Sequence, residues 1–469
     1  MHNLTVTATA GKSDLTVVIV GHSSAKLPRL IGKEAVRIAK GELDGPLGLV
    51  CDEGMYLLVK VSEKPWLVGG EAWRMLGKTI VDAARGAKAK AVTVLVQGTA
   101  ADPQSLVEGL YLADYRYDVL RSGKAATRTE LTVRIPNQAA AIKAGTAVAS
   151  AQNLARELAD MPANLLNPKT FTERVRKQLR STGLKITVIS GISALTKAGF
   201  PGLVQVGKAG SAEPAMIEIT YTPKRADKGV QLAFVGKGIT FDTGGISIKP
   251  SASMWEMKGD MSGAAAVLGA MQLISQTKPD VRVKGYLCLA ENMPDRNAVR
   301  PGDIYRARNG KYIHVDNTDA EGRLVLSDVL TYAAEKGATH IVDIATLTGA
   351  CLVALGDKIS GLLGRNQTFL DQVRAAGQEV GEEYWQLPLY GEYRSLLDHP
   401  HADINNTGGR NGGTITAALF LSEFIPESVK WAHLDIAGPA MQTGGWRYYA
   451  KGMTGVATRT LARLAHNLA

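Results

Sequence analysis

The stretch Asn317-Thr318-Asp319-Ala320-Glu321-Gly322-Arg323-Leu324 places two carboxylates two residues apart, with a guanidinium two residues further on. It lies just before a run over residues 325–336 that predicts a helix. Acidic side chains are favoured where a helix begins, because the unpaired backbone N–H groups there carry partial positive charge. One interpretation is therefore an ordinary helix cap, in which Thr318 or Asp319 caps the helix and Glu321 lies in its first turn.

A second group of charged residues lies upstream, around a glycine-rich loop. Residues 230–235 are apolar and predict a buried strand, the end of which carries Lys237, and the loop after it carries Asp242. Asp260 immediately precedes residues 262–276, which predict another helix. Ligand sites in α/β sheets lie at the carboxyl ends of the strands, and glycines let the backbone approach a bound group closely. This region is therefore a candidate binding site.

Together the two groups supply four carboxylates and three cations, all on predicted strand ends, loops or helix starts. They are Asp242, Asp260, Asp319, Glu321, Lys237, Lys249 and Arg323. Four clustered carboxylates repel one another unless cations compensate them. Hard divalent metals are the usual compensation, and two ions sharing bridging carboxylates would satisfy this set. The alternative is a structural network of ion pairs, which are common and only weakly stabilising on a surface.

These residues carry a resemblance to the leucyl aminopeptidase family, the hexameric aminopeptidases with two metal ions per subunit. The octapeptide at 317–324, in order with the lysine–aspartate loop, is highly specific to that family. The resemblance covers essentially everything after residue 160, through residues 235–250, 257–267, 291–303, 315–324, 343–351 and 406–410, and more weakly to 461. Departures from the family pattern are minor and leave the seven charged residues intact: Thr243, Asp295-Arg296 and Gly413-Thr414.

The resemblance implies two divalent ions per subunit, zinc or manganese, with magnesium or cobalt as alternatives. Asp242 and Glu321 would bridge both ions, Lys237 and Asp260 would complete the tighter site, and Asp319 would complete the more exchangeable one. A lysine ligand is unusual, because only the neutral amine has a lone pair to donate. Its ordinary pKa is about 10.4, so a neighbouring metal must lower that value considerably.

The resemblance also implies which residues act on the substrate. Lys249 would stabilise negative charge on the scissile carbonyl, and Arg323 would hold a bicarbonate ion that acts as general base. The backbone around Thr346 and Leu347 would contact the substrate, and Met257 would line the pocket for the first side chain. The expected activity is release of N-terminal residues, preferentially leucine or other hydrophobic ones, from short peptides with a free N-terminus.

No competing catalytic constellation is convincing. The chain has no His-Glu-x-x-His pair, Gly-x-Ser-x-Gly elbow or P-loop. His399-Pro400-His401 is better explained as a surface loop, and His314 and His433 as packing residues within apolar runs. The cysteines share no metal-binding spacing, and Cys351 is expected to be an inert buried thiol.

Composition favours a cytoplasmic enzyme. Three cysteines in 469 residues argue against a disulfide framework. Residues 1–14 lack a basic region followed by an apolar run, so no secretory signal is expected. The most apolar stretch, residues 338–356, contains His340 and Asp343 and is interpreted as a buried strand and loop, so no membrane span is expected.

The pattern of apolar runs predicts an α/β protein with two domains. Residues 15–135 alternate strand-like with helical runs, and an alanine-rich helix over about 137–161 would connect them to a second α/β region. With the resemblance, this predicts a smaller N-terminal α/β domain of macro-like type over residues 1–150. A larger C-terminal α/β catalytic domain would follow over 151–469, with a mixed sheet sandwiched by helices.

The net charge of +10 could favour nucleic acid or acidic partners. The basic residues are scattered, however, and no groove-reading element is visible. DNA binding, which some bacterial relatives show, is therefore only an alternative second role. Two other hypotheses are a catalytically dead relative, which should have lost charged site residues, and a two-metal phosphatase or nuclease, which would not need the lysine ligand. The resemblance further implies a homohexamer, a dimer of trimers.

Overall fold

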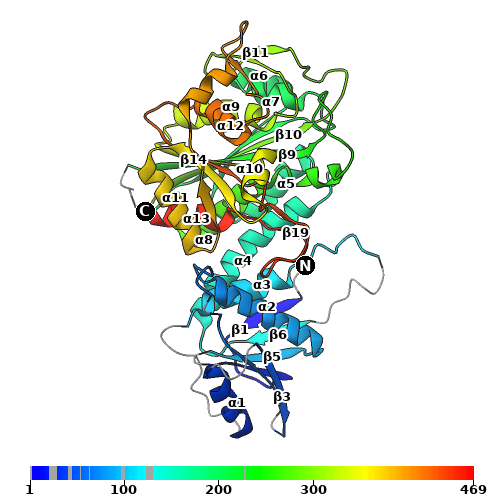
Figure 1. Cartoon of the computed structure of the whole chain (residues 1–469), viewed down its shortest axis with the longest axis vertical. Helices are drawn as coiled ribbons and strands as arrows, with labels where there is room; N and C mark the ends of the chain where they lie inside the picture. Colours follow the sequence, from blue (N-terminus) through cyan, green and yellow to red (C-terminus); the bar gives the residue numbers. More distant parts are fainter. Residues whose placement is uncertain are drawn as a thin grey trace. The chain divides into compact units, whose positions relative to one another are not determined.

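The computed structural model describes residues 3–20, 29–40, 45–52, 54–62, 64–96, 101–122, 130–225 and 229–469. The chain divides into a smaller unit, Met1–Asn153 with Thr443–Lys451, and a larger unit, Leu154–Gln442 with Gly452–Ala469. Figure 1 labels the elements of both units. The predicted connector is helix α4 (Ala139–Asp160), and the chain passes from one unit to the other within it.

The smaller unit contains a six-stranded sheet in the order β1-β6-β5-β2-β4-β3. All neighbouring strands are parallel except the β3–β4 pair. Val17 and Val94 on the two central strands are fully buried, as parallel strands covered on both faces require. The elements are β1 (Leu4–Thr7), β2 (Leu15–Ile19), α1 (Arg29–Ala39), β3 (Leu47–Cys51), β4 (Gly54–Val59), α2 (Glu71–Gly86), β5 (Ala91–Leu95), α3 (Pro103–Asp114) and β6 (Leu131–Arg134).

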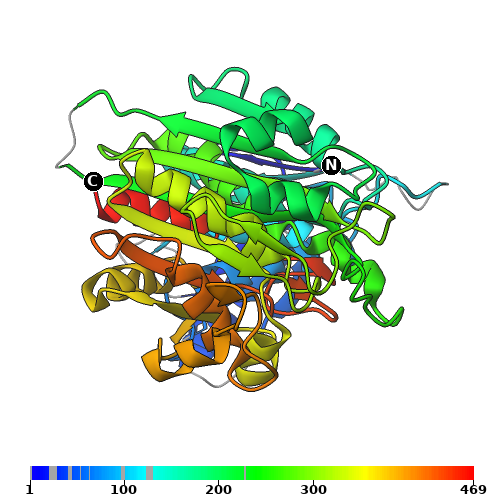
Figure 2. The ribbon, with the colours of Figure 1, turned by 90° about the horizontal axis from the view of Figure 1, so that it is seen from above.

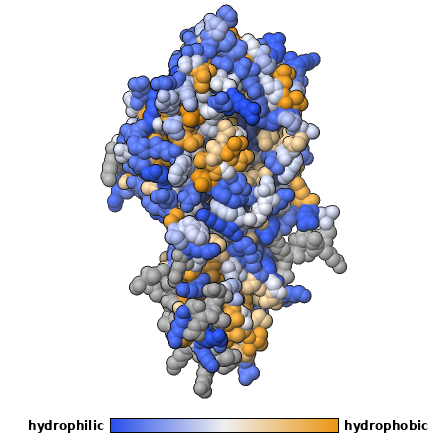
Figure 3. All heavy atoms as spheres, in the orientation of Figure 1, coloured by the Kyte–Doolittle hydropathy of each residue, from blue (hydrophilic) through white to orange (hydrophobic). Residues whose placement is uncertain are grey.

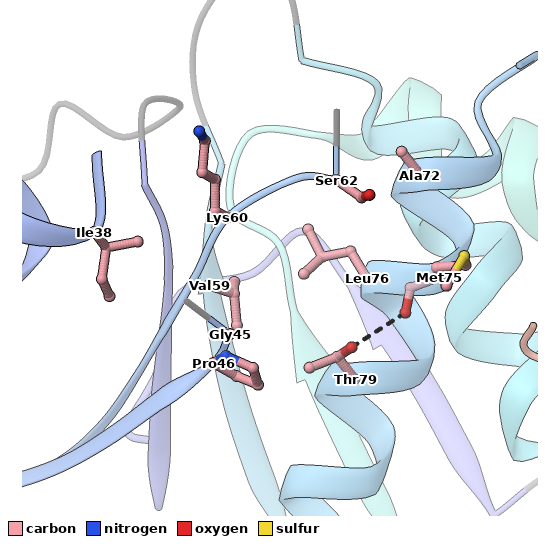
Figure 4. Close-up of a pocket in the computed structure, with 10 residues that line it drawn as sticks. All are labelled: Ile38, Gly45, Pro46, Val59, Lys60, Ser62, Ala72, Met75, Leu76 and Thr79. Carbon is pink, nitrogen blue, oxygen red and sulfur yellow. Dashed lines mark hydrogen bonds between the residues drawn. The ribbon is translucent and has the colours of Figure 1, made fainter. Parts of the chain in front are cut away.

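Helix α3 ends at Asp114, because Tyr115 takes an extended conformation with ψ 133°. A pocket of about 210 Å³ lies between α1, the end of β4 and α2, and Figure 4 shows its lining. Lys60 is the one charged residue among the ten that line it, and none of the predicted site residues is among them.

A short segment from the C-terminal part of the chain belongs to the smaller unit. Strands β18 (Met441–Gln442) and β19 (Gly452–Met453) pair antiparallel, and the segment between them, Thr443–Lys451, is held by buried polar contacts. Glu71 accepts hydrogen bonds from the Tyr448 hydroxyl and from Arg447 Nη1, both at 2.9 Å. Burying a carboxylate is costly unless it is paired, so these bonds fix the segment firmly.

The larger unit is built on an eight-stranded mixed sheet, β15-β14-β17-β13-β9-β10-β8-β7. Its four central strands, β17, β13, β9 and β10, are mutually parallel. Their carboxyl ends therefore meet at one edge of the sheet. The strands are β7 (Lys185–Ser190), β8 (Ala215–Tyr221), β9 (Gln231–Asp242), β10 (Arg282–Asn292), β13 (His340–Ala345), β14 (Ser360–Arg365), β15 (Tyr384–Gln386) and β17 (Lys430–Asp435).

Helices cover both faces of this sheet, as Figures 1 and 2 show. One face carries α5 (Pro168–Leu179), α8 (Ser262–Thr277), α11 (Gln367–Glu379) and α13 (Thr458–Asn467). The other carries α6 (Ile192–Ala198), α7 (Pro201–Gly207), α9 (Gly322–Glu335) and α12 (Gly413–Ser422). The shorter elements are η2 (Met254–Gly259), β11 (Ile304–Arg306), β12 (Tyr312–His314), α10 (Gly349–Leu355), η3 (Gly391–Leu397) and β16 (Ile404–Asn405). The predicted α/β class, with a mixed sheet between helices, is confirmed.

Strand β9 differs from the prediction in a way that matters for the site. It runs from Gln231 to Asp242, so Lys237 lies inside the strand and Asp242 is its last residue. Side chains alternate along a strand, so Val235 and Lys237 face α9. Gly236 faces α8, where a Cβ would lie 2.6 Å from backbone atoms of Ala264 and Gly263, so only glycine permits this packing.

Candidate metal and catalytic site

Six of the seven predicted charged residues form one group of ion pairs, which we call the ion-pair cluster. Lys237 Nζ lies 2.9 Å from Asp260 Oδ2 and 2.8 Å from Glu321 Oε1. Lys249 Nζ lies 2.9 Å from Asp242 Oδ2 and 2.5 Å from Asp319 Oδ1. These residues come from β9, the loop after it, the end of η2 and the start of α9, so the tertiary structure brings separate segments together.

The octapeptide does not act as a helix cap. Glu321 occupies the N-cap position of α9 but makes no side-chain capping hydrogen bond, and its carboxylate lies beside Lys237. The Thr318 hydroxyl donates to the Gly244 carbonyl, and the Asp319 carboxylate lies beside Lys249, so neither predicted residue caps the helix. At Gly322 a Cβ would lie 2.7 Å from Lys237 Nζ, so a side chain there would displace the lysine. The capping interpretation is therefore wrong.

The ion-pair cluster is largely buried, and burial shifts its pKa values. Burial raises the pKa of Asp260 to about 6 and the pKa of Glu321 to about 8, although Lys237 acts to lower both. For Lys237 and Lys249, burial alone would lower the ammonium pKa. The neighbouring carboxylates outweigh that effect and leave both pKa values above their usual range. Each lysine is therefore protonated beside its carboxylates.

The donor set also fits divalent metal ions. Asp242, Asp319 and Glu321 each place one carboxylate oxygen within 4.8 Å of the others. Asp260 Oδ2, Asp319 Oδ1 and Glu321 Oε1 are buried, and the contact of each is with a lysine Nζ. Two lysines do not balance four carboxylates. A divalent cation held by these carboxylates would compete for them and favour the neutral amine of Lys237.

Asn292 and Asn406, which the sequence analysis gave no role, and Thr318, which it gave only as a possible helix cap, make hydrogen bonds that orient the cluster and the octapeptide. Asn292, the last residue of β10, donates through Nδ2 to Asp242 Oδ1 at 2.8 Å and to the Thr318 carbonyl at 3.0 Å. The Thr318 hydroxyl donates to the Gly244 carbonyl, which joins the octapeptide to the glycine-rich loop. Asn406 Oδ1 accepts from the backbone N–H of Asp316 at 2.8 Å. The sequence feature that could have identified Asn292 as a site residue is its position at the end of an apolar strand.

Arg323 lies in the first turn of α9 and is almost fully buried. Its Nη1 donates to the Asn406 carbonyl at 2.7 Å, but its Nε has no hydrogen-bond partner among the described residues. Burial lowers the pKa of Arg323 to about 10, while Glu321 and Asp435 act to raise it. A buried guanidinium with an unused N–H group is suited to holding a small anion.

The predicted substrate-contacting residues lie beside the cluster. The Thr346 hydroxyl donates to Asp260 Oδ1 at 2.7 Å, and Lys237 Nζ donates to the Thr346 carbonyl at 3.1 Å. Leu347 follows in the same loop and is partly buried. Met257, in η2, accepts a backbone hydrogen bond from Asp260 N–H at 3.2 Å. The structure thus brings all ten predicted site residues into one region of the larger unit.

The remaining histidines and cysteines form no second centre of this kind among the described residues. His401 is exposed, and His399 stacks on His314 with ring centroids 3.8 Å apart. His433 is fully buried and its Nδ1 lies 2.6 Å from Asp343 Oδ1. Cys351 is buried, and burial raises the pKa of its thiol to about 12, so it is the inert residue expected.

The chain is similar to known aminopeptidases over most of its length. Residues 153–462 match the catalytic-domain model of the cytosol aminopeptidase family. A "probable cytosol aminopeptidase" of Aquifex aeolicus is 43% identical over 400 residues, covering 84% of this chain and 81% of that protein. One from Streptomyces avermitilis is 41% identical and covers 97% of this chain and 89% of that protein.

A solved structure described as the bottromycin maturation enzyme BotP in complex with Mn is also similar. It has 34% sequence identity and a TM-score of 0.86, and the match covers 97% of this chain and 100% of that chain. The fold and donor set define a metal-dependent hydrolase. The chain belongs to the cytosol aminopeptidase family, and it is therefore a metallo-exopeptidase that acts on peptides. No helix in the described part of the chain is both long and apolar enough to span a membrane.

Proposed function

We propose that this enzyme binds two divalent ions and releases N-terminal residues, preferentially leucine or other hydrophobic ones, from short peptides. The ion-pair cluster carries this proposal, because it places four carboxylates and a lysine amine at the edge where the parallel strands end. Turnover of a panel of amino-acid amides tests it. Leucine amide should be among the best substrates, and faster turnover of acidic or basic residues would contradict the preference.

Asp242 and Glu321 would bridge the two ions, with Lys237 and Asp260 completing the tighter site and Asp319 the more exchangeable one. Zinc or manganese is proposed, with magnesium or cobalt as alternatives. When bound, the ions would supply an activated water as nucleophile and polarise the scissile carbonyl. Asn292 supports these roles, because its bond to Asp242 holds that carboxylate in a fixed orientation.

Lys249 is proposed to stabilise the oxygen that becomes negative as the carbonyl is attacked. Its ammonium is mostly buried beside Asp242 and Asp319, where a positive charge acts more strongly than in water. Arg323 is proposed to hold bicarbonate as the general base. The buried Nε of Arg323, which lacks a hydrogen-bond partner among the described residues, supports an anion there.

Thr346 and Leu347 are proposed to contact the peptide backbone, and Met257 to line the pocket for the first side chain. Thr346 contacts both Asp260 and Lys237, so a peptide bound along this loop would lie against the proposed metal ligands. Met257 and Leu347 both have apolar side chains, which favours a hydrophobic first residue.

The free N-terminus of the peptide is expected to be essential. A neutral α-amine can serve as a ligand, and its pKa of about 7.7–8.0 makes the neutral form accessible above that value. Activity should therefore rise from about pH 7 toward about pH 9 as this amine loses its proton. N-acetylated peptides should not be cleaved in a chromatographic assay that compares each with its free-amine counterpart. Efficient cleavage of an acetylated peptide, or of an internal bond, would show that the exopeptidase assignment is wrong.

A homohexamer, a dimer of trimers, is proposed as the assembly. The larger unit exposes large apolar side chains, and Figure 3 shows apolar surface over α10, where Leu352 and Val353 are 43% and 88% exposed. Others are Ile246, Ile248, Trp255, Trp385, Tyr390, Tyr393 and Leu396. So much exposed apolar surface is typical of self-association. Light scattering should give about six times the chain mass, whereas a fully active monomer would contradict the assembly.

A cytoplasmic location is proposed, since the buried residues Cys288 and Cys351 are free thiols. DNA binding is kept only as the alternative second role. A gel shift at increasing salt tests it, because a charge-driven complex should weaken steeply as salt rises. The absence of any shift at low salt would remove this role.

A further inference from the structure

The loop at residues 346–348, between β13 and α10, is held from two sides. On one side Thr346 is tied to Asp260 and Lys237 of the ion-pair cluster. On the other side Leu347 N–H donates to Asp435 Oδ1 at 3.1 Å, and the Thr348 hydroxyl donates to Asp435 Oδ2 at 2.6 Å. Asp435 therefore anchors the face of the loop that does not contact the cluster.

The position and the burial of Asp435 suit it to holding the loop at residues 346–348. It is the last residue of β17, which is paired in parallel with β13, so its side chain lies next to the point where the loop begins. The residue is fully buried, and no described cation lies within ion-pair distance of it, although it acts on Arg323 through its charge. A buried carboxylate in direct contact with no cation depends on hydrogen bonds, and the loop donates to both of its oxygens.

The hydrogen bonds around Thr348 have only one consistent direction. An ionised carboxylate can only accept, so the Thr348 hydroxyl donates its single proton to Asp435. Thr348 Oγ1 must then accept both from the Thr414 hydroxyl at 2.9 Å and from Cys351 N–H at 3.0 Å. Asp435 thereby sets the orientation of the loop, the start of α10 and Thr414 on α12.

We infer that Asp435 is a positioning residue, which holds the loop at residues 346–348 in the place where it can bind the peptide substrate. The inference rests on the proposed role of Thr346 and Leu347 as substrate contacts. Asp435 acts through the loop and does not itself touch the reacting atoms.

The isosteric change Asp435→Asn is the first test. If the amide NH₂ faces Leu347 N–H, that anchoring bond is lost. If it faces Thr348, the Thr348 hydroxyl must turn from donor to acceptor, which disturbs its bonds to Thr414 and to Cys351 N–H. KM for a dipeptide is expected to rise about tenfold while kcat changes less than about threefold. Metal content should be unchanged, because Asp435 contacts no proposed ligand directly.

Asp328→Asn is the matched control. Asp328 is also fully buried and accepts backbone N–H bonds from Gly202 at 2.6 Å and Arg308 at 2.8 Å, but it has no contact with the loop. It should lose thermal stability as Asp435→Asn does, without the rise in KM. An equal rise in KM in both variants would show that the effect is general loosening and would overturn the inference.

Thr348 separates the hydrogen bond from the charge, since Asp435 also acts on the pKa of Arg323. Thr348→Val removes the hydroxyl and leaves that charge in place, and it should raise KM as Asp435→Asn does. Thr348→Ser keeps the hydroxyl and should recover most of the loss. If Asp435→Asn fails to fold, Thr348→Val and Thr348→Ser still test whether anchoring of the loop affects KM. A Thr348→Val enzyme with unchanged KM would overturn the inference.

Leu347→Ala distinguishes failure of this inference from failure of the proposed substrate contact. If KM changes in Leu347→Ala but stays normal in Asp435→Asn and Thr348→Val, Leu347 contacts the substrate and Asp435 does not position the loop. If KM is normal in all three variants, both the substrate contact and the positioning role are wrong. A raised KM in all three, with Asp328→Asn normal, is the expected result.

Discussion

Removal of divalent metal is expected to abolish peptide hydrolysis, and manganese or zinc should restore it. The carboxylates of the ion-pair cluster can hold metal ions, but they are too weakly basic to act as the nucleophile themselves. Hydrolysis therefore needs the water that bound ions would activate. The loss should be gradual during chelation. The site with Lys237 and Asp260 is proposed to hold its ion more tightly than the site with Asp319.

The measurement combines turnover of leucine amide with elemental analysis of the same sample. Thermal melting of the metal-free enzyme provides the control, because the lysine–carboxylate ion pairs should keep it folded when the ions are gone. Full activity in a folded sample verified to be free of metal would rule out the proposed mechanism.

Replacing Lys249 or Arg323 with alanine is expected to lower kcat strongly while metal content stays near about two ions per chain. Neither side chain is a proposed metal ligand. Lys249 is proposed to stabilise developing negative charge and Arg323 to hold the general base, so both losses should lower kcat. Removing one stabilising donor of this kind typically lowers kcat by about 10²–10³-fold. The effect of Arg323→Ala should be the milder of the two, because water or bicarbonate from the buffer can partly substitute.

Lys311→Ala is a suitable control for both variants. Lys311 pairs with Glu423 outside the ion-pair cluster, so its loss should leave kcat unchanged. Elemental analysis separates the possible roles of the two test residues. If Lys249→Ala or Arg323→Ala lost metal in proportion to activity, that residue would be a ligand or a structural support, and its proposed catalytic role would be wrong.

Much of the larger unit could be predicted from local sequence. Residues 230–235, 281–289, 340–344 and 431–436 are rich in apolar residues and have the length of buried strands, and each overlaps a strand of the sheet. The charged residues could be found for the same reason. They interrupt apolar or glycine-rich sequence, where an uncompensated charge is costly and needs a function.

Other features depend on contacts that no local pattern encodes. The sequence predicted that the strand at residues 230–235 would carry Lys237 at its end and that Asp242 would lie in the loop after it. In the structure Gly236 lets α8 pack closely, and β9 continues to Asp242. The helix-cap interpretation of the octapeptide was locally reasonable too. It was wrong because the Thr318 hydroxyl donates to the Gly244 carbonyl and Lys249, on another segment, pairs with the Asp319 carboxylate.

The sequence by itself therefore determined the α/β class, the identity of the seven charged residues and, through its resemblance, the family. Only the tertiary structure decided how those charges pair and which polar groups hold them in place. Asn292, Asn406 and Asp435 are ordinary polar residues in the sequence. Asn292 and Asp435 become part of the site because parallel strands bring their carboxyl ends to one edge of the eight-stranded sheet. Asn406 follows β16 of the three-stranded sheet, and it reaches the octapeptide through the backbone N–H of Asp316.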